Sequence, residues 1–192
     1  MAAVITSASL LEIVSRTAPI IQENAEIGEH ERRLADATVQ ALINAGLFRM
    51  WLPRAFGGSE IDPVNAMRVI EEVSRFDSAA GWNLQISVAF ALFLPWFGEE
   101  GTAEMLGSHD VVFGGTLFPP GRASRVDGGY RLTGRWPFIS GCQHCSWFFT
   151  PALVTDGGQQ SQTPTTQPIQ LLFAYRAEEA EIIDTGSFRS IL

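Results

Sequence analysis

The sequence predicts an α+β protein in which an all-helical domain, residues 1–108, precedes a β domain, residues 109–192. Two changes of pattern predict this order. Up to Leu106 apolar residues recur at helical spacing, and after Gly107 short apolar or alternating runs bounded by Gly and Pro replace them. An Asp-Gly-Gly turn at Asp127–Gly129 also joins two of these runs, as in a β-hairpin.

Several helices are expected in the amino-terminal domain. Asp62 followed by Pro63 supplies a cap and a first-turn residue for one of them. Met67, Ile70 and Val73 follow at helical spacing and are expected to face the core. The expected helices are Ser9–Ile21, Glu29–Ala45, one beginning at Pro63, one beginning at Asp77 or Ser78, and Glu99–Leu106.

The stretch Ala79–Phe97 contains 19 residues without a charge, which is the length of a membrane span. It also contains Asn83, Gln85 and Pro95, which are unfavourable in such a span. A helix buried inside a helical domain has the same apolar pattern on nearly every side. We therefore expect a core helix and no contact with a membrane.

The β domain is expected to hold several short strands. The Pro-Pro-Gly sequence at Pro119–Gly121 predicts a turn, and the stretch Asp156–Gln167, rich in Gly, Gln, Ser and Thr, predicts a surface loop. The expected strands are Val111–Leu117, Ser124–Asp127, Tyr130–Phe138, Trp147–Val154, Ile169–Tyr175 and Ala180–Ile183.

The composition argues against two classes of protein. A net charge of −8 without a basic run is unsuited to nucleic acid, because such binding needs cations that displace phosphate counterions. Two cysteines are too few for a secreted disulfide scaffold, and the amino terminus lacks the basic start and apolar core of a signal peptide. We expect a cytoplasmic protein that does not bind nucleic acid.

The stretch Tyr130–Thr150 offers the most functional side chains. Its two Trp and three Phe residues provide flat surfaces for a planar ligand such as a flavin ring, and Ser140 precedes Gly141, which allows a close backbone approach. The residues alone favour a plainer interpretation, in which Ser140 and Gly141 form a turn and Trp136 and Trp147 lie in the core. No GxGxxG motif follows a strand, which argues against a dinucleotide-binding domain.

Cys142 and Cys145 belong to a Cys-Gln-His-Cys motif, a spacing found in metal sites and redox pairs. A zinc site needs four ligands, and the sequence has no second pair of cysteines. A thioredoxin-like pair opens a helix, whereas this motif precedes a predicted strand. We therefore expect neither a metal site nor a redox pair at the motif.

Several motifs together resemble the acyl-CoA dehydrogenase superfamily: the loop LPRAFGG, the DSAAGW start of the buried helix, and GRWPFISG. The series GGTLFPPGRA and VDGGYRLTGRWPFISGCQHCSWF is more narrowly similar to the oxygenase components of two-component flavin monooxygenases. The resemblance covers almost the whole chain. It implies an antiparallel, β-barrel-like middle domain, which this chain holds in part, and FAD or FMN as the cofactor.

The resemblance also implies a cofactor site. It places the ring of Phe138 against the flavin and the hydroxyl of Ser140 near the reactive N5 atom, so that Ser140 would be a catalytic residue. Backbone groups of the first β strand, at Gly115, Thr116 and Leu117, would bind the pyrimidine side of the flavin.

On the buried helix, the resemblance places Trp82 and Phe90 at the pocket of a small-molecule substrate. Many monooxygenase relatives have a histidine roughly where this chain has Phe90, so the chain departs from that branch at this position. Relatives also continue into a C-terminal four-helix bundle, which supplies a catalytic Glu or His and most contacts of a homotetramer. The sequence ends at SFRSIL, and we expect that bundle to be missing.

Three functions follow from these expectations. The first is a monooxygenase that hydroxylates an apolar or aromatic substrate with reduced flavin from a flavin reductase partner. The second is a true acyl-CoA dehydrogenase that acts on CH–CH groups with FAD. The third, from another class, is a truncated and non-catalytic remnant, which the missing bundle favours.

Overall fold

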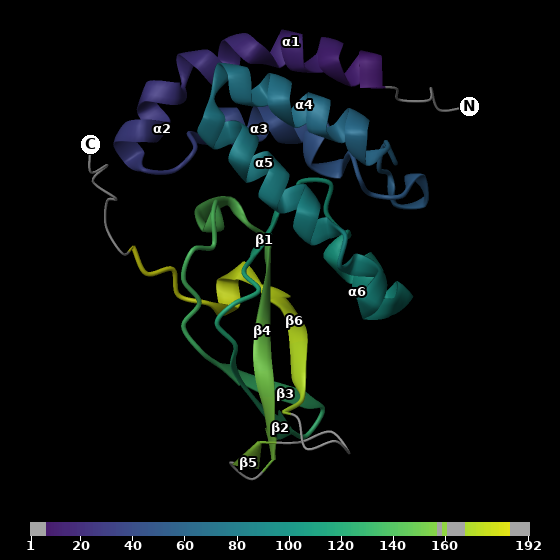
Figure 1. Cartoon of the computed structure of the whole chain (residues 1–192), viewed down its shortest axis with the longest axis vertical. Coiled ribbons are helices and arrows are strands. Elements are labelled where there is room, and N and C mark those ends of the chain that lie inside the picture. The colour runs from purple at the N-terminus through teal and green to yellow at the C-terminus, as the bar shows by residue number, and fades with distance from the viewer. Residues whose placement is uncertain (1–6, 157–158, 161–167, 185–192) are drawn as a thin grey trace. The chain divides into compact units, whose positions relative to one another are not determined.

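The computed structural model describes residues 7–156, 159–160 and 168–184, in which helices are followed by one sheet (Figure 1). The chain divides into two compact units. The helical unit runs to Val112 and includes residues 181–184, and the sheet unit is Phe113–Ala180. The boundary between the units therefore lies a few residues after the position predicted from the sequence. Each unit has buried apolar side chains of its own.

The helical unit begins with α1, whose buried residues Leu10, Val14 and Ile21 follow helical spacing and so confirm the predicted helix. The helices and 3-10 turns of this unit are α1 (Ser7–Glu23), α2 (Ala25–Glu31), α3 (Asp36–Asn44), η1 (Leu47–Arg49), η2 (Arg54–Phe56), α4 (Pro63–Phe76), α5 (Ser78–Ala91), η3 (Leu94–Phe97) and α6 (Gly98–Met105).

One predicted helix, Glu29–Ala45, is two helices in the structure. The chain leaves α2 at Arg32, which adopts the left-handed conformation with φ 57°. The N–H of Arg33 donates to the carbonyl of Gly28 at 3.2 Å, which is the bond that closes a Schellman end. This cap ends α2, and α3 begins separately at Asp36. The apolar spacing alone did not reveal the break.

The start of α4 confirms the predicted cap, because the Asp62 side chain accepts a hydrogen bond from the N–H of Asn65 at 3.1 Å. The predicted inner face is partly wrong. Met67 is 47% exposed, whereas Val69 and Val73 are fully buried. Neighbouring residues in a helix point in directions about 100° apart, and Met67 therefore points away from the buried stripe.

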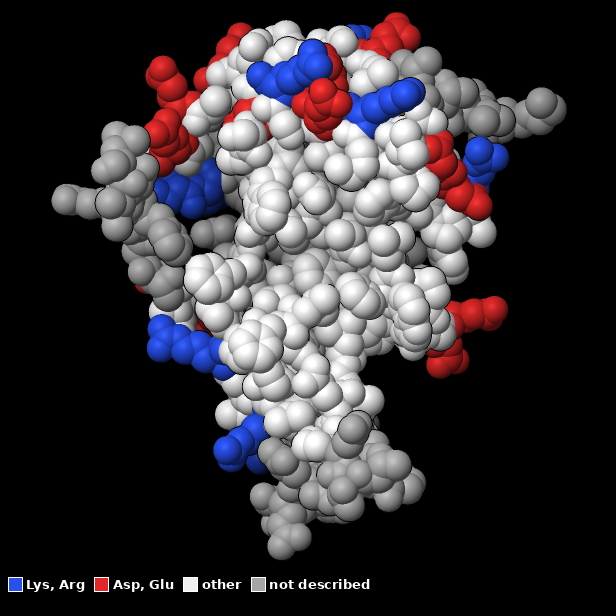
Figure 2. Space-filling view, in the orientation of Figure 1, with Lys and Arg blue, Asp and Glu red and all other residues white. Residues whose placement is uncertain are grey.

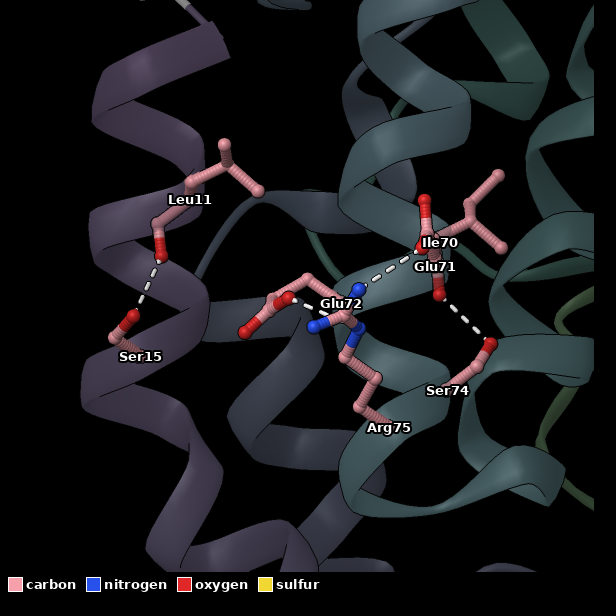
Figure 3. Close-up of polar contacts among 7 residues, drawn as sticks. All are labelled: Leu11, Ser15, Ile70, Glu71, Glu72, Ser74 and Arg75. Carbon is pink, nitrogen blue, oxygen red and sulfur yellow. Dashed lines mark hydrogen bonds and ion pairs between the residues drawn. The ribbon is translucent and has the colours of Figure 1, made fainter.

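Helices α4 and α5 approach each other closely at Gly81. A β-carbon on Gly81 would lie 1.9 Å from Ser74 Oγ, so only glycine fits at this crossing. Figure 3 shows Ser74 donating to the carbonyl of Ile70, at 2.7 Å, within α4. The hydroxyl is thereby satisfied inside its own helix and leaves room for α5.

Charges are mixed on the outer surface of the helical unit. Figure 2 shows acidic and basic side chains side by side over its helices. In Figure 3, Arg75 lies between Glu71 and Glu72, with nitrogen to oxygen distances of 3.1 Å and 3.6 Å. These ion pairs on α4 keep opposite charges together.

The apolar stretch Ser78–Met105 is long and apolar enough to cross a membrane by length and composition alone. In the structure, 44% of its most apolar 18-residue segment is buried. The core helix of a soluble protein has the same length and apolar composition. The stretch is also interrupted, because α5 ends at Ala91 and η3, with Pro95 in its first turn, follows before α6. The predicted start is confirmed by Asp77, which accepts from the N–H of Ala79 at 2.8 Å.

The sheet unit is built around β4, which pairs with four other strands (Figure 1). Its elements are β1 (Phe113–Gly115), β2 (Gly121–Val126), β3 (Gly129–Thr133), η4 (Cys142–His144), β4 (Trp147–Asp156), β5 (Gln159–Gln160), β6 (Gln170–Arg176) and η5 (Ala177–Glu179). Most of the predicted loop Asp156–Gln167 lies outside the described residues, although Gln159–Gln160 pairs with the end of β4. The strand predicted at Ala180–Ile183 is wrong, since those residues have no strand structure.

The sheet is mixed and open, which corrects the expected antiparallel barrel. β1 and β2 both run parallel to β4, while β3, β5 and β6 form antiparallel pairs. β1 lies beside the first residues of β4 and β2 beside its last residues, so the turn predicted at Pro119–Gly121 does not reverse the chain. Among the described strands, β3 pairs only with β2 and β6 only with β4, and therefore no pairing closes a barrel.

Trp136 holds the segment that leads from β3 toward η4. Its indole Nε1 donates to the carbonyl of Pro151 in β4 at 3.1 Å. A β-carbon on Gly121 would lie 2.4 Å from Cζ2 of the indole, so the ring rests against the start of β2. The predicted strand Tyr130–Phe138 therefore ends at Thr133, and residues 134–139 follow an irregular path along the sheet.

Candidate functional site

The candidate site begins where β1 ends. Gly115 is buried opposite Phe149 of β4, and the N–H of Thr116 extends this ladder by donating to the carbonyl of Phe149 at 3.1 Å. The Thr116 hydroxyl donates to the carbonyl of Phe118 at 2.8 Å, which turns the chain out of the strand. Leu117, at 55% exposed, consequently lies on the surface of the sheet unit.

A second part of the site is the segment before η4. Phe138 adopts the left-handed conformation with φ 60°, and its side chain is 78% exposed. Ser140 is half-buried and is followed by Gly141, which is also left-handed with φ 70°. The N–H of Cys142 donates to the carbonyl of Ile139 at 3.3 Å, so Ser140 and Gly141 form the turn that the plainer interpretation predicts. A large exposed aromatic ring on a left-handed backbone is unusual, and such strain is often found at functional sites.

Gly114 brings these two segments together. A β-carbon on Gly114 would lie 3.4 Å from Ile139 Cγ2 and 2.4 Å from Cys145 Sγ. The segment that carries Phe138 and Ser140 is therefore packed directly against the strand that carries Gly115. Residues that the sequence analysis named from two separate segments thus lie in one part of the sheet unit.

The two cysteines of the Cys-Gln-His-Cys motif lie beside this site. Burial, and to a smaller extent the neighbouring Cys142, raises the pKa of the Cys145 thiol far above its ordinary value. Cys145 is therefore a neutral thiol near pH 7, in contrast to the low-pKa nucleophile of a thioredoxin-like pair. Within the described part of the chain no group of three or more His, Cys, Asp or Glu side chains is arranged to hold a metal ion.

The predicted substrate residues lie on α5 of the helical unit. Trp82 is 52% exposed and presents an aromatic surface. Phe90 is 7% exposed, and its ring centroid lies 5.9 Å from that of Phe93 inside the unit. Trp82 is thus accessible to a ligand, whereas Phe90 belongs to the aromatic core, and its predicted substrate contact stays a prediction.

Sequence reasoning missed the residues that join the two parts of the site. These are Gly114, Ile139 and Cys145, which meet only in the folded sheet unit. A weak signal was present, because two glycines precede Thr116 within a predicted strand, and glycine in a strand often marks a close approach by another segment. Phe118, 76% exposed beside Thr116, was also missed.

Known proteins with a similar sequence or fold identify the family of this chain. Residues 12–105 match the family described as acyl-CoA dehydrogenase, N-terminal domain. The structure of XiaF from a Streptomyces species, in complex with FADH2 and glycerol, superposes with a TM-score of 0.87 at 28% identity, covering 95% of this chain and 45% of that one. The chain belongs to the acyl-CoA dehydrogenase superfamily. The match to XiaF extends across both units, beyond the amino-terminal family domain.

Two curated proteins are also similar in sequence. The pigment production hydroxylase of a Rhodococcus species is 28% identical over 182 residues, which is 94% of this chain and 45% of the relative. The oxygenase subunit HsaA of a flavin-dependent monooxygenase from Rhodococcus jostii is 32% identical over 130 residues, 67% of this chain and 34% of the relative. The chain therefore spans less than half the length of these relatives.

Proposed function

We propose that this chain carries the flavin-contacting part of the oxygenase component of a two-component monooxygenase. The observation that carries the proposal is the packing of Ile139 against Gly114, which places the end of β1 beside the turn with Phe138 and Ser140. Support comes from relatives named as oxygenase subunits of flavin-dependent monooxygenases and as the oxygenase component of an FADH2-dependent resorcinol hydroxylase.

The side chains of this part of the sheet unit fit a flavin ring. Such a ring is planar and apolar on its faces, with hydrogen-bonding atoms along one edge. Phe138 and Leu117 offer exposed apolar surface, and Thr116 and Ser140 offer hydroxyl groups. The exposed ring of Phe138 on a left-handed backbone suits contact with a planar ligand.

The proposed roles follow from this chemistry. Phe138 would contact a face of the ring, backbone groups of Gly115, Thr116 and Leu117 would bind its polar edge, and Ser140 would donate a hydrogen bond near N5. A bound flavin supplies two-electron redox chemistry and reaction with oxygen. The residues of this chain would orient the flavin, hold a hydrogen-bond donor at its reactive edge and limit access of water.

The substrate and partners belong to the same proposal. Relatives named indole-3-acetate monooxygenase and resorcinol hydroxylase suggest a small aromatic substrate, for which the exposed Trp82 offers a stacking surface. Reduced FMN or FAD would come from a flavin reductase, in the cytoplasm. A homotetramer, expected for full-length relatives, would complete the site.

The origin of the oxygen atom in the product tests this function. Chemically reduced FMN or FAD would be added to the chain with ¹⁸O₂ and a panel of phenols and indoles, and the products analysed by mass spectrometry. The proposal predicts a hydroxylated product that contains one ¹⁸O atom. Desaturation of an acyl-CoA without oxygen incorporation would instead identify a dehydrogenase, and the absence of both reactions would favour the non-catalytic remnant.

A further inference from the structure

We propose that Cys142 and Cys145 form an oxidisable dithiol that controls the shape of the turn Phe138–Gly141. The chain has two cysteines: Cys142 begins the 3-10 turn η4, and Cys145 directly follows it. Both are thiols in the structure. The consequence for flavin binding rests on the proposed function, whereas the dithiol and its effect on the turn do not.

The backbone holds the two cysteines at a separation that a disulfide spans. The N–H of Cys145 donates to the carbonyl of Cys142 at 3.4 Å. A turn with this pattern keeps its end Cα atoms within about 7 Å, and disulfides join Cα atoms about 4.4–6.8 Å apart. Cys142 also influences the pKa of Cys145, after the larger effect of burial, which is consistent with neighbouring sulfur atoms.

The two sulfur atoms have different surroundings. The thiol of the half-buried Cys142 donates to Oε1 of Gln143 at 3.5 Å, in a contact that is open to solvent. The Cys145 thiol donates to the carbonyl of Gly141 at 3.3 Å and lies against Gly114. An oxidant therefore reaches Cys142 first, and Cys145 is placed to complete the disulfide.

The oxidant that we assign is hydrogen peroxide. Its source would be reduced flavin and oxygen when no substrate takes up the oxygen, and this source rests on the proposed function. The sulfur of Cys142 attacks one peroxide oxygen, the O–O bond breaks and water leaves, which produces a sulfenic acid. The sulfur of Cys145 then displaces the hydroxyl group, which leaves with the Cys145 proton as a second water. Two thiols and one peroxide become one disulfide and two waters, and two electrons pass from sulfur to oxygen.

Disulfide formation changes the contacts of the turn. It removes the hydrogen that Cys145 donates to Gly141, and it draws Sγ from Gly114 toward Cys142. Gly141 directly follows Ser140, so these changes act on the residues proposed to contact the flavin. The reduced form is then the form that binds flavin, and peroxide released without substrate turns the site off.

Mass spectrometry tests the disulfide. The chain would be treated with hydrogen peroxide, and its remaining thiols alkylated before digestion without reductant. We expect the peptide with both cysteines to lose two hydrogen atoms, to escape alkylation and to revert with dithiothreitol. Cys142→Ser and Cys145→Ser, which each keep one thiol, are the matched controls and give no such peptide. Thiols that stay reduced, or that form sulfinic acid without pairing, overturn the proposal.

Hydrogen exchange tests the effect on the turn. Amides of residues 139–145 are expected to exchange at different rates after oxidation, while those of β6 stay unchanged, and dithiothreitol restores the original rates. Equal exchange in the two forms contradicts control of the turn. Neither measurement contains flavin, so a chain that forms the disulfide and changes its exchange but binds no flavin disproves the proposed function and leaves the dithiol standing.

Discussion

Ile139 lies against Gly114. A β-carbon added to Gly114 would lie 3.4 Å from Ile139 Cγ2 and 2.4 Å from Cys145 Sγ. The contact joins β1 to the segment that precedes β4. The sulfur of Cys145 leaves no room for a side chain at position 114, since real β-carbons do not approach other heavy atoms as closely as 2.4 Å. The identity of one residue therefore determines how the two parts of the candidate site meet.

Gly114→Ala is expected to destabilise the sheet unit and to weaken flavin binding. The new methyl group clashes with Cys145 Sγ and displaces it, a form of overpacking that typically costs about 1–3 kcal/mol in free energy of unfolding. Urea denaturation measures the loss. Gly129→Ala, at a strand position where a β-carbon meets nothing within 4 Å, is the matched control and should change little. Equal stability of the two variants would contradict the packing described.

Gly81→Ala tests the crossing of α4 and α5. Alanine favours an isolated helix by about 1 kcal/mol over glycine, but at this position its methyl group would lie 1.9 Å from Ser74 Oγ and 2.9 Å from Ser74 Cα. Because the backbone of α4 is part of the clash, we expect a net loss of about 1–3 kcal/mol in thermal or urea unfolding. A variant more stable than the wild type would show that the helices separate without cost.

Phe138→Gly separates stability from binding. Glycine accepts the left-handed conformation of φ 60°, so the free energy of unfolding is expected to stay constant or to rise by up to about 1 kcal/mol. Loss of the ring should weaken flavin binding by about 0.5–1.5 kcal/mol, measured by fluorescence titration. Phe138→Tyr keeps the ring and should bind like the wild type. A glycine variant with lower stability and unchanged binding would assign Phe138 to the core.

The cap of α4 predicts a stability that depends on pH. The N–H and the side chain of Asn65 hold the pKa of Asp62 below its ordinary value, in that order of importance. A carboxyl group whose pKa is lower in the folded than in the unfolded protein stabilises the fold fully at pH values above its unfolded pKa, about 3.9. This stabilisation is lost as the pH falls through the lower pKa of the folded protein. Asp62→Ala should therefore be less stable than the wild type at neutral pH, with a difference that shrinks in acid.

Asp62→Asn provides the control for this prediction, because asparagine also caps helices but does not titrate in this range. Its stability at neutral pH should be close to that of the wild type. Thermal unfolding at a series of pH values measures all three proteins. If the difference between wild type and Asp62→Ala were constant from neutral pH into acid, the carboxylate would not be the stabilising group.

Local chemistry made much of the fold predictable. Asp62 and Asp77 cap the helices that the sequence assigned to them, because a cap needs only the next few residues. The hairpin at Asp127–Gly129 and the strand at Trp147 were likewise predicted from neighbouring residues. The order of helices before strands followed from the change in apolar spacing near Gly107.

The features that escaped prediction depend on distant contacts. The parallel pairing of β1 and β2 with β4 is not encoded in a turn motif, because each pairing joins segments far apart in the chain. The strand ends at Thr133 because Trp136 bonds to Pro151, which alternation in the sequence does not reveal. The residue types at Phe138 and Ser140 suggested a ligand contact, but their position beside β1 depends on the fit of Ile139 over Gly114.

A flavin titration of the 192-residue chain tests the central claim most directly. Oxidised and reduced FMN and FAD would be titrated while flavin and Trp fluorescence are followed, for the wild type, Ser140→Ala, Phe138→Ala and the control Ser15→Ala, whose hydroxyl lies exposed on α1. We predict saturable binding that is weakened by the first two substitutions and unchanged by the third. Failure of the wild type to bind either flavin in either redox state, or equal binding by all four proteins, would contradict the proposed site.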